Sequence, residues 1–428
     1  MYPAVVAERD PGVSTSKLAG FGALYFAQGI PLGIAAEYLP VALRQSHASY
    51  SLIAAVSWLQ LPWALKVLWA RAGDLPSVRV KARRLVLLLQ LGLAAIVATY
   101  AAAPLASSRA LWFTLTALAA LFAATQDVLV DGLAVRSLGK EERGLGNVAQ
   151  VGAYRLGMVF GGAGLLVLGA KLGERWAIGA LAASIAVGSA GVVLVGEPRL
   201  DPDATPAEAK ETRRKSLVDE IRLTGRTLAS MLHRDVRAVL AVAFFYKLGL
   251  HTASTLLKPV LVDGGWSKER IGTLAVTVGT LAGVAGSMAG GLLHKKAGDR
   301  GGLTIAAVLQ ALACAPLFFV PGSTSETARV TVALAVEHAA SGLGTTVLFA
   351  ALMGATNPKH ASLQYTVLST ANALSLAVAG ALGAAIADVS SPRWSFALGA
   401  ALSLGSLALV PAFTGAARAL HEGRELPP

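Results

Sequence analysis

Charge and cysteine are both scarce in this sequence. Only 14% of its 428 residues are charged and 6% are aromatic, whereas 54% are apolar. A charged share this low excludes an ordinary soluble protein, in which about a quarter of residues are charged. The single cysteine, Cys314, excludes an intramolecular disulfide, and its place in an apolar run predicts a packing role. No charged leader with a small-residue cleavage site is found, so we expect no cleaved signal peptide.

Enzyme signatures are also missing. The sequence contains no HExxH or GxSxG motif and no His/Cys grouping with metal-ligand spacing, so we expect neither an enzyme nor a metal cofactor. The formal net charge is +12, but Lys and Arg lie in short connectors rather than on one amphipathic face, which argues against nucleic-acid binding. A membrane channel or receptor is the alternative class, although repeated pore elements and a soluble output domain are absent from the sequence.

The sequence has long apolar runs instead. A run of about 20 such residues crosses the hydrocarbon core as a helix, and abundant glycine lets membrane helices approach closely. Residues 197–236 interrupt the runs with charges and prolines and are predicted to form a cytoplasmic linker. We therefore predict an all-α membrane protein with two six-helix bundles, residues 1–196 and 237–428. The twelve predicted spans are 18–42, 50–71, 84–103, 110–136, 146–169, 175–195, 237–262, 270–294, 302–320, 329–354, 362–388 and 394–416.

The distribution of positive charge predicts the orientation of the spans. Lys and Arg gather in the connectors after the second, fourth and eighth spans and in the linker, while the other connectors hold far fewer. Because cytoplasmic loops carry the excess of positive charge, both termini and the linker are predicted to be cytoplasmic. The lipid bilayer is therefore an expected partner of the chain.

Ionisable residues inside the spans are the main functional signal. An unpaired charge at the centre of a bilayer costs at least about 2.5 to 3.5 kcal/mol, so such residues usually face a hydrated cavity. Asp127 and Asp131 share one face of the fourth span, and Arg155 is expected at similar depth in the fifth. One interpretation is proton exchange at Asp127 and Asp131, with Arg155 tuning them or binding an anionic group of the substrate. The alternative is a fixed structural ion pair.

Other spans carry further candidates for a substrate site. Lys66 either faces the cavity or extends toward the inner interface, and Lys247 and His251 share a face of the seventh span. Glu337 in the tenth span is buried in any register, either for function or for a helix-packing hydrogen bond. Glu37 lies near the outer end of the first span, where a charge is inexpensive, and we give it no functional role.

Two similar turns follow the second and eighth spans, Gly73-Asp74 and Gly298-Asp299. Arg83, Arg84 and Arg300 lie nearby at the predicted cytoplasmic surface. We expect Asp74, Asp299 and these arginines to act in gating, since an Asp there can accept hydrogen bonds from a helix N-terminus in one state and release them in another. Ordinary solvated turns are the alternative. The recurrence also fits two parallel repeats.

Several stretches together match a known pattern: Gln28-Gly29-Ile30-Pro31-Leu32, Leu65-Lys66-Val67-Leu68-Trp69, Thr125-Gln126-Asp127 with Asp131, Glu142-Arg143-Gly144, Gly152-Ala153-Tyr154-Arg155-Leu156-Gly157, Glu337-His338 to Gly344-Thr345, and Gln364 before Leu368-Ser369. With twelve spans and a long middle linker, the chain resembles the major facilitator superfamily and, within it, the AmpG family. This resemblance covers residues from about 18 to 415.

The resemblance implies a monomeric, proton-linked permease of the bacterial cytoplasmic (inner) membrane that uses the proton gradient and no cofactor. Members import anhydromuropeptides; relatives carry siderophores, and a eukaryotic branch moves acetyl-CoA. It also implies that Gln28, Gln126, Tyr154 and Gln364 contact a small-molecule substrate.

We therefore expect import of a polar solute of the siderophore or muropeptide class, with some details of the sequence closer to siderophore carriers. A CoA-thioester transporter and a drug or metabolite efflux carrier of the same fold are the alternatives. The two bundles are expected to rock around a cavity at the midplane.

Overall fold

The computed structural model describes residues 15–70, 78, 80–138, 142–196, 225, 229, 233, 236–322, 324–356 and 361–422. Within these ranges every regular element is a helix. Ten of the described helices are long and apolar enough to cross a membrane, and Tyr50–Leu65 is a shorter apolar helix. One of the ten, Lys268–Gly322, has 55 residues and turns sharply at Gly298, where φ is 63°. This arrangement confirms an all-α membrane protein and is consistent with twelve spans.

The helices of the first half follow the predicted spans closely. They are α1 (Thr15–Gly33), η1 (Ile34–Tyr38), α2 (Leu39–Gln45), α3 (Tyr50–Trp58), α4 (Leu61–Leu65), α5 (Val67–Ala70), α7 (Ala82–Tyr100), α8 (Arg109–Ser137), α9 (Glu142–Val159), η3 (Phe160–Gly164), α10 (Leu165–Leu172), α11 (Glu174–Gly188) and α12 (Gly191–Val195). The second predicted span differs most, because it is broken near Gln60 and again at Lys66.

The second half begins at α15. Its elements are α15 (Arg237–Phe245), α16 (Leu248–Asp263), α17 (Lys268–Leu274), η4 (Ala275–Gly279), α18 (Thr280–Phe319), η5 (Val320–Gly322), α19 (Thr327–Ala355), α20 (Ala361–Val389), α21 (Pro392–Gly405), η6 (Ser406–Leu409) and α22 (Val410–Glu422). The seventh predicted span is also broken, between α15 and α16 at Tyr246 and Lys247. Breaks inside membrane spans are tolerated where the backbone is covered by protein rather than lipid.

Glycine sets the distance between α1 and α9. A Cβ added at Gly29 would lie 2.1 Å from the carbonyl oxygen of Tyr154, and one added at Gly157 would lie 2.0 Å from that of Phe26. Neither position can hold a larger residue without moving a backbone. Small residues at such crossings allow extensive van der Waals contact, which is the main attraction between helices in a bilayer. This crossing fixes Tyr154 against the face of α1.

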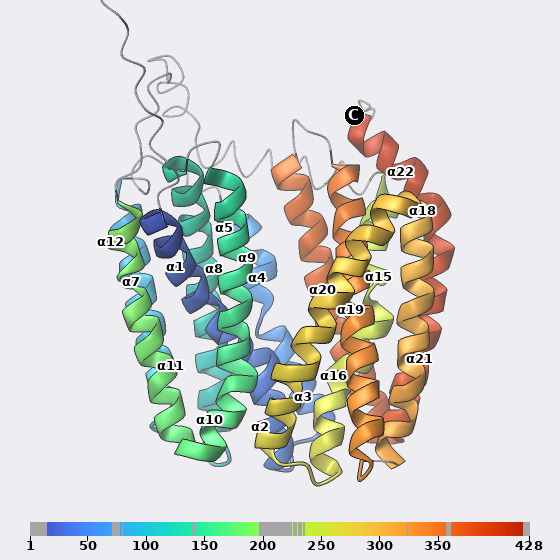
Figure 1. The fold of residues 1–428 in the computed structure, drawn as a ribbon, viewed down its shortest axis with the longest axis horizontal. Coiled ribbons are helices and arrows are strands. Elements are labelled where there is room, and N and C mark those ends of the chain that lie inside the picture. Colours follow the sequence, from blue (N-terminus) through green and yellow to red (C-terminus); the bar gives the residue numbers. More distant parts are fainter. Residues whose placement is uncertain are drawn as a thin grey trace, which may run out of the picture.

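Figure 1 shows the helices up to α12, drawn in blue to green, beside those from α15 onward, drawn in yellow to red. The two groups make contact where α2 meets α16, α3 and α4 meet α20, and α10 meets α17. The proposed domain limits of 1–196 and 237–428 remain a prediction, because most of the linker 197–236 lies outside the described residues.

Ion pairs join the two groups at the end of the molecule opposite the C-terminus (Figure 1). The guanidinium of Arg44 donates to both oxygens of Asp263, at 2.6 and 2.8 Å, and Tyr50 donates to the same carboxylate. Two more pairs, Lys171 with Glu269 and Lys268 with Glu174, have N–O distances of 3.5 Å. We call these three ion pairs the outer junction, because the charge distribution predicts that this end faces outside.

Candidate functional site

An ion pair between Lys66 and Asp127 lies at the centre of the first polar cluster. Lys66 occupies the break between α4 and α5, and its Nζ lies 2.5 Å from Oδ2 of Asp127 on α8. The Asp127 side chain is only 8% exposed, whereas that of Lys66 is 27% exposed. Pairing offsets much of the cost of burying either charge. The geometry therefore directs Lys66 inward to a carboxylate.

Asp131 lies one turn further along α8 and has a different set of partners. Its Oδ1 accepts a hydrogen bond of 2.6 Å from the hydroxyl of Tyr25 on α1 and one of 3.2 Å from Nε2 of Gln150 on α9. Tyr25 is buried. The two carboxylates, predicted to share a helix face, therefore lie in one cluster that joins α1, α4, α8 and α9.

Aromatic residues support the lysine. Nζ of Lys66 lies 5.4 Å from the centroid of the Trp63 ring, within the range of a cation–π contact. Trp63 in turn makes an edge contact with Tyr154, with ring centroids 5.9 Å apart. The predicted substrate residue Tyr154 thus belongs to this cluster.

Arg155 and Gln126 are placed differently from their neighbours. Arg155 is exposed and, among the described contacts, pairs with neither Asp127 nor Asp131. Tyr154 contacts Trp63, and the next side chain along α9 points in a different direction because successive helical residues are rotated by about 100°. The amide of Gln126 donates 2.6 Å to Gln90, whose own amide donates 3.1 Å to the backbone of Ile185. This chain joins α8, α7 and α11, so it serves helix packing.

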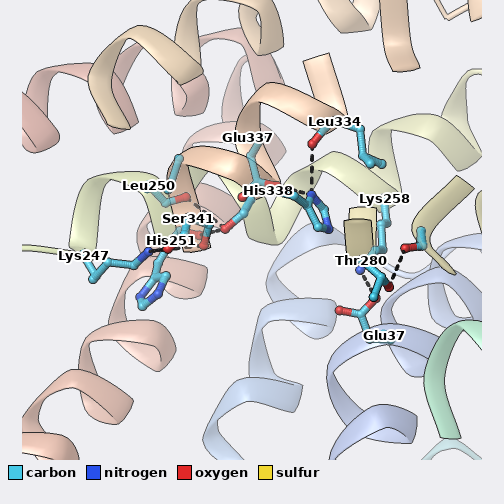
Figure 2. A network of polar contacts seen from close by, with 12 residues as sticks. Glu37, Lys247, Leu250, His251, Lys258, Thr280, Leu334, Glu337, His338 and Ser341 are labelled. Atoms are coloured by element: carbon cyan, nitrogen blue, oxygen red, sulfur yellow. Dashed lines mark hydrogen bonds and ion pairs between the residues drawn. The ribbon is translucent and has the colours of Figure 1, made fainter. Parts of the chain in front are cut away.

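The second polar cluster lies in the second half (Figure 2). Lys247, at the break before α16, is 1% exposed and donates to the carbonyl and hydroxyl of Ser341 at 3.0 and 3.2 Å. His251 lies one turn later, and its buried Nδ1 has no hydrogen-bond partner in the described part of the chain. Glu337 on α19 is 3% exposed, and its Oε2 lies 2.6 Å from Nδ1 of His338. Lys247, His251 and Glu337 are thus brought together as one cluster.

Two predicted glutamines are buried. Gln28 on α1 is completely buried, and neither its amide nitrogen nor its oxygen has a partner within the described residues. An unpaired buried amide is costly, so Gln28 is a candidate to hydrogen-bond a bound solute or an ordered water. Gln364 on α20 is also buried.

The predicted gating residues are dispersed. Asp74 lies outside the described residues. Arg83 donates 3.1 Å to the backbone of Val192, and Asp299, which follows the turn at Gly298, lies 2.7 Å from Nε2 of His294. Arg84 and Arg300 are exposed.

Two surface hollows lie away from both clusters. One of about 550 Å³ is bounded by α1, α11 and α12, and one of about 370 Å³ lies near Trp266. Neither is lined by the ionisable clusters, so the hydrated midplane cavity remains a prediction.

Sequence reasoning missed the contacts between the halves, both the outer junction and a further ion pair. Lys258 on α16 forms an ion pair with Glu37 in η1, the residue to which we gave no role (Figure 2). A lysine directly before Pro259 in an apolar span was the signal that could have indicated it. Tyr25 and Gln150 were missed as well, because their importance depends only on their contact with Asp131.

Comparison with known families agrees with this fold. The model of the Major Facilitator Superfamily matches residues 18–336, most of the chain. The chain belongs to this superfamily. It is therefore a multi-pass membrane transporter for a small molecule rather than an enzyme.

Curated relatives confirm the resemblance to AmpG-type proteins. "Putative transporter AmpG 4" of Rickettsia felis is 27% identical over 82% of this chain and 85% of its own length. The "Anhydromuropeptide permease" of Escherichia coli K12 is 26% identical over 82% of this chain and 70% of its own length. Among solved structures, a mutant form of the nucleoside transporter NupG has a TM-score of 0.71 with 12% identity, covering 94% of this chain and 99% of that one. This last similarity supports the fold alone.

Proposed function

We propose that this transporter imports a muropeptide-like solute together with protons. The observation that carries the proposal is the ion pair of Lys66 with Asp127, inside the bundle and within one cluster with Asp131. The similarity to an anhydromuropeptide permease supports the solute class, since the peptide part of such a solute carries carboxylates. A carboxylate on the solute is the group that Lys66 is suited to bind.

The ion pair suggests how proton and solute binding are coupled. When a proton binds the carboxylate of Asp127, that group loses its charge and no longer holds the ammonium of Lys66. The ammonium is then free to pair with a carboxylate of the solute. Each ligand therefore favours the other, and this reciprocity is what a symporter requires. When the proton leaves Asp127, the carboxylate competes for Lys66 and displaces the solute.

Other predicted residues complete the proposed site. Gln28 has two unused hydrogen-bonding atoms within the described residues, and His251 presents an unpartnered Nδ1 beside Lys247. Groups of this kind on α1 and α16, one from each half, suit a solute with several polar groups held between the halves. Rocking of the halves, with the outer junction opening and closing, would expose such a site to each side in turn. We place the protein in the bacterial inner membrane as a monomer, with both termini cytoplasmic.

The test is uptake into proteoliposomes under an imposed pH gradient. Radiolabelled anhydromuropeptide and a ferric siderophore are supplied separately, and unlabelled CoA thioester serves as a competitor. We expect saturable muropeptide accumulation that disappears when the gradient is collapsed. Glu326→Gln, which removes an exposed carboxylate from the end of α19, is the matched control for variants of Asp127. Accumulation of the siderophore alone would overturn the solute class, and gradient-independent uptake would overturn the coupling.

A further inference from the structure

Glu37 and Lys258 form an ion pair that crosses between the two groups of helices (Figure 2). Both residues precede the outer-junction residues Arg44 and Asp263 along the same two spans. Their side chains are 30% and 13% exposed. Glu37 belongs to η1 of the first span, and Lys258 belongs to α16 of the seventh. Any movement that separates these two helices must break the pair.

Three π-helical turns lie around this pair and His338. Glu37 lies in η1, and Gly162 of η3 is so close that an added Cβ would be 2.4 Å from the Cβ of Glu37. A Cβ added at Gly279 of η4 would lie 3.0 Å from the ring of His338. Contacts between η1 and η3 and between η3 and η4 complete the arrangement. Single π-helical turns are rare and occur often at functional sites, which makes their convergence here informative.

The ion pair connects to the carboxylate of Glu337 through its neighbours. Lys258 acts electrostatically on both Glu337 and His338, and Glu37 acts on His338. Glu337 and His338 are themselves in contact at 2.6 Å. The groups that face this network are Lys247 at the break before α16, His251 and Lys258 from α16, Glu37 from η1, Cys314 from α18, and Glu337 and His338 from α19.

The charges in this network balance. Lys247 and Lys258 carry positive charge, Glu37 and Glu337 carry negative charge, and both imidazoles are neutral in the unprotonated state. One proton added to His338, beside the carboxylate of Glu337, leaves the buried network with a net positive charge. That charge is expensive away from water and repels Lys258, whose own charge acts on His338.

We propose that Glu337 and His338 form a proton-binding site separate from Asp127, and that protonation there weakens the closure made by Glu37 and Lys258. The inference rests on the proposed proton-coupled function for its biological purpose. It assigns the second half of the protein a proton site of its own and assigns Glu37 a role in closing the outer side. The Glu37–Lys258 ion pair and the proton site at Glu337 and His338 then act as one unit.

The test measures the outer junction directly, without solute. Spin labels are attached to the full-length protein in nanodiscs at Lys171→Cys and Glu269→Cys, two exposed positions on opposite halves whose own ion pair is thereby removed from the reference and from every variant alike. Cys314 is buried and stays in place, and labelling of the unmodified chain controls for it. Pulsed dipolar spectroscopy gives the fractions of molecules with close and with separated labels. Lowering the pH from about 7.5 to about 5.5, across the usual range of histidine, should raise the separated fraction about threefold or more.

Two variants make opposite predictions. Glu337→Gln removes the negative charge permanently and should show separated labels at both pH values. His338→Asn keeps the charges balanced while removing the imidazole, and its labels should stay close together at both pH values. Asp127→Asn should respond to pH like the reference protein. The proposal is overturned if the pH response is absent from the reference, persists in both variants of α19, or disappears in Asp127→Asn. Because no solute is present, failure of the uptake assay would leave this result standing.

Discussion

Lys66 contacts Asp127 at 2.5 Å and thereby joins the break between α4 and α5 to the middle of α8. The break matters because it ends the regular helix at the residue that supplies the ammonium group. The carboxylate of Asp127 can bind either the ammonium group of Lys66 or a proton. The first two predictions follow from this competition.

Asp127→Asn should abolish accumulation of the solute against its gradient, because an amide cannot take and release the proton. We expect the accumulation ratio in proteoliposomes to fall about tenfold or more, while downhill exchange of solute continues. The protein should remain in the membrane at normal levels. Retained uphill uptake in this variant would remove Asp127 from the coupling role.

Lys66→Gln should weaken solute binding. A hydrogen bond to a charged group contributes about 1.5 to 3 kcal/mol, so the apparent affinity should fall about 10- to 100-fold, as measured by equilibrium binding to purified protein. Lys66→Arg should retain most of the affinity, because it retains the charge. Lys296→Gln, the same change at an exposed position, is the control. Unchanged affinity in Lys66→Gln would leave the ion pair with a structural role only.

Gly157→Ala should destabilise the protein by forcing α1 and α9 apart. The added Cβ would lie 2.0 Å from a backbone oxygen, and overpacking of this kind typically costs about 1 to 3 kcal/mol. Gly179→Ala is the matched control, because nothing in the described residues lies within 4 Å of its added Cβ. A thermal unfolding series in detergent should show a lower Tm for the first variant alone. Equal Tm values would contradict the close crossing.

Asp263→Asn should loosen the outer junction, since it weakens the contacts with both Arg44 and Tyr50. Exposed ion pairs contribute about 0.2 to 1 kcal/mol, so the separated fraction of the spin-labelled protein should rise by about 1.4- to fivefold. Glu326→Gln, which affects a pair within one helix at the same end, should leave the fraction unchanged. If both variants behave alike, Asp263 has no particular part in closing this end.

Much of the fold and part of the site could be predicted from residues near one another in the sequence. Apolar runs marked the spans, and the i, i+4 spacing of Asp127 and Asp131 placed both in one cluster. The expected pairing with Arg155 was not found in the described part of the structure, because Lys66 occupies that place. Depth along the membrane can be counted from the sequence, but the direction in which a side chain points depends on how its helix is rotated against its neighbours.

The sequence by itself determined that this chain crosses a membrane many times and carries costly charges inside its spans, because the free energy of transfer into lipid depends on local composition. Only the tertiary structure decided which charges meet. Lys66 reaches Asp127 because its helix breaks there, and Lys258 reaches Glu37, 221 residues away in the chain, because their two helices lie together. Such pairs form through the packing of glycine faces and interrupted helices, which are properties of the assembled bundle.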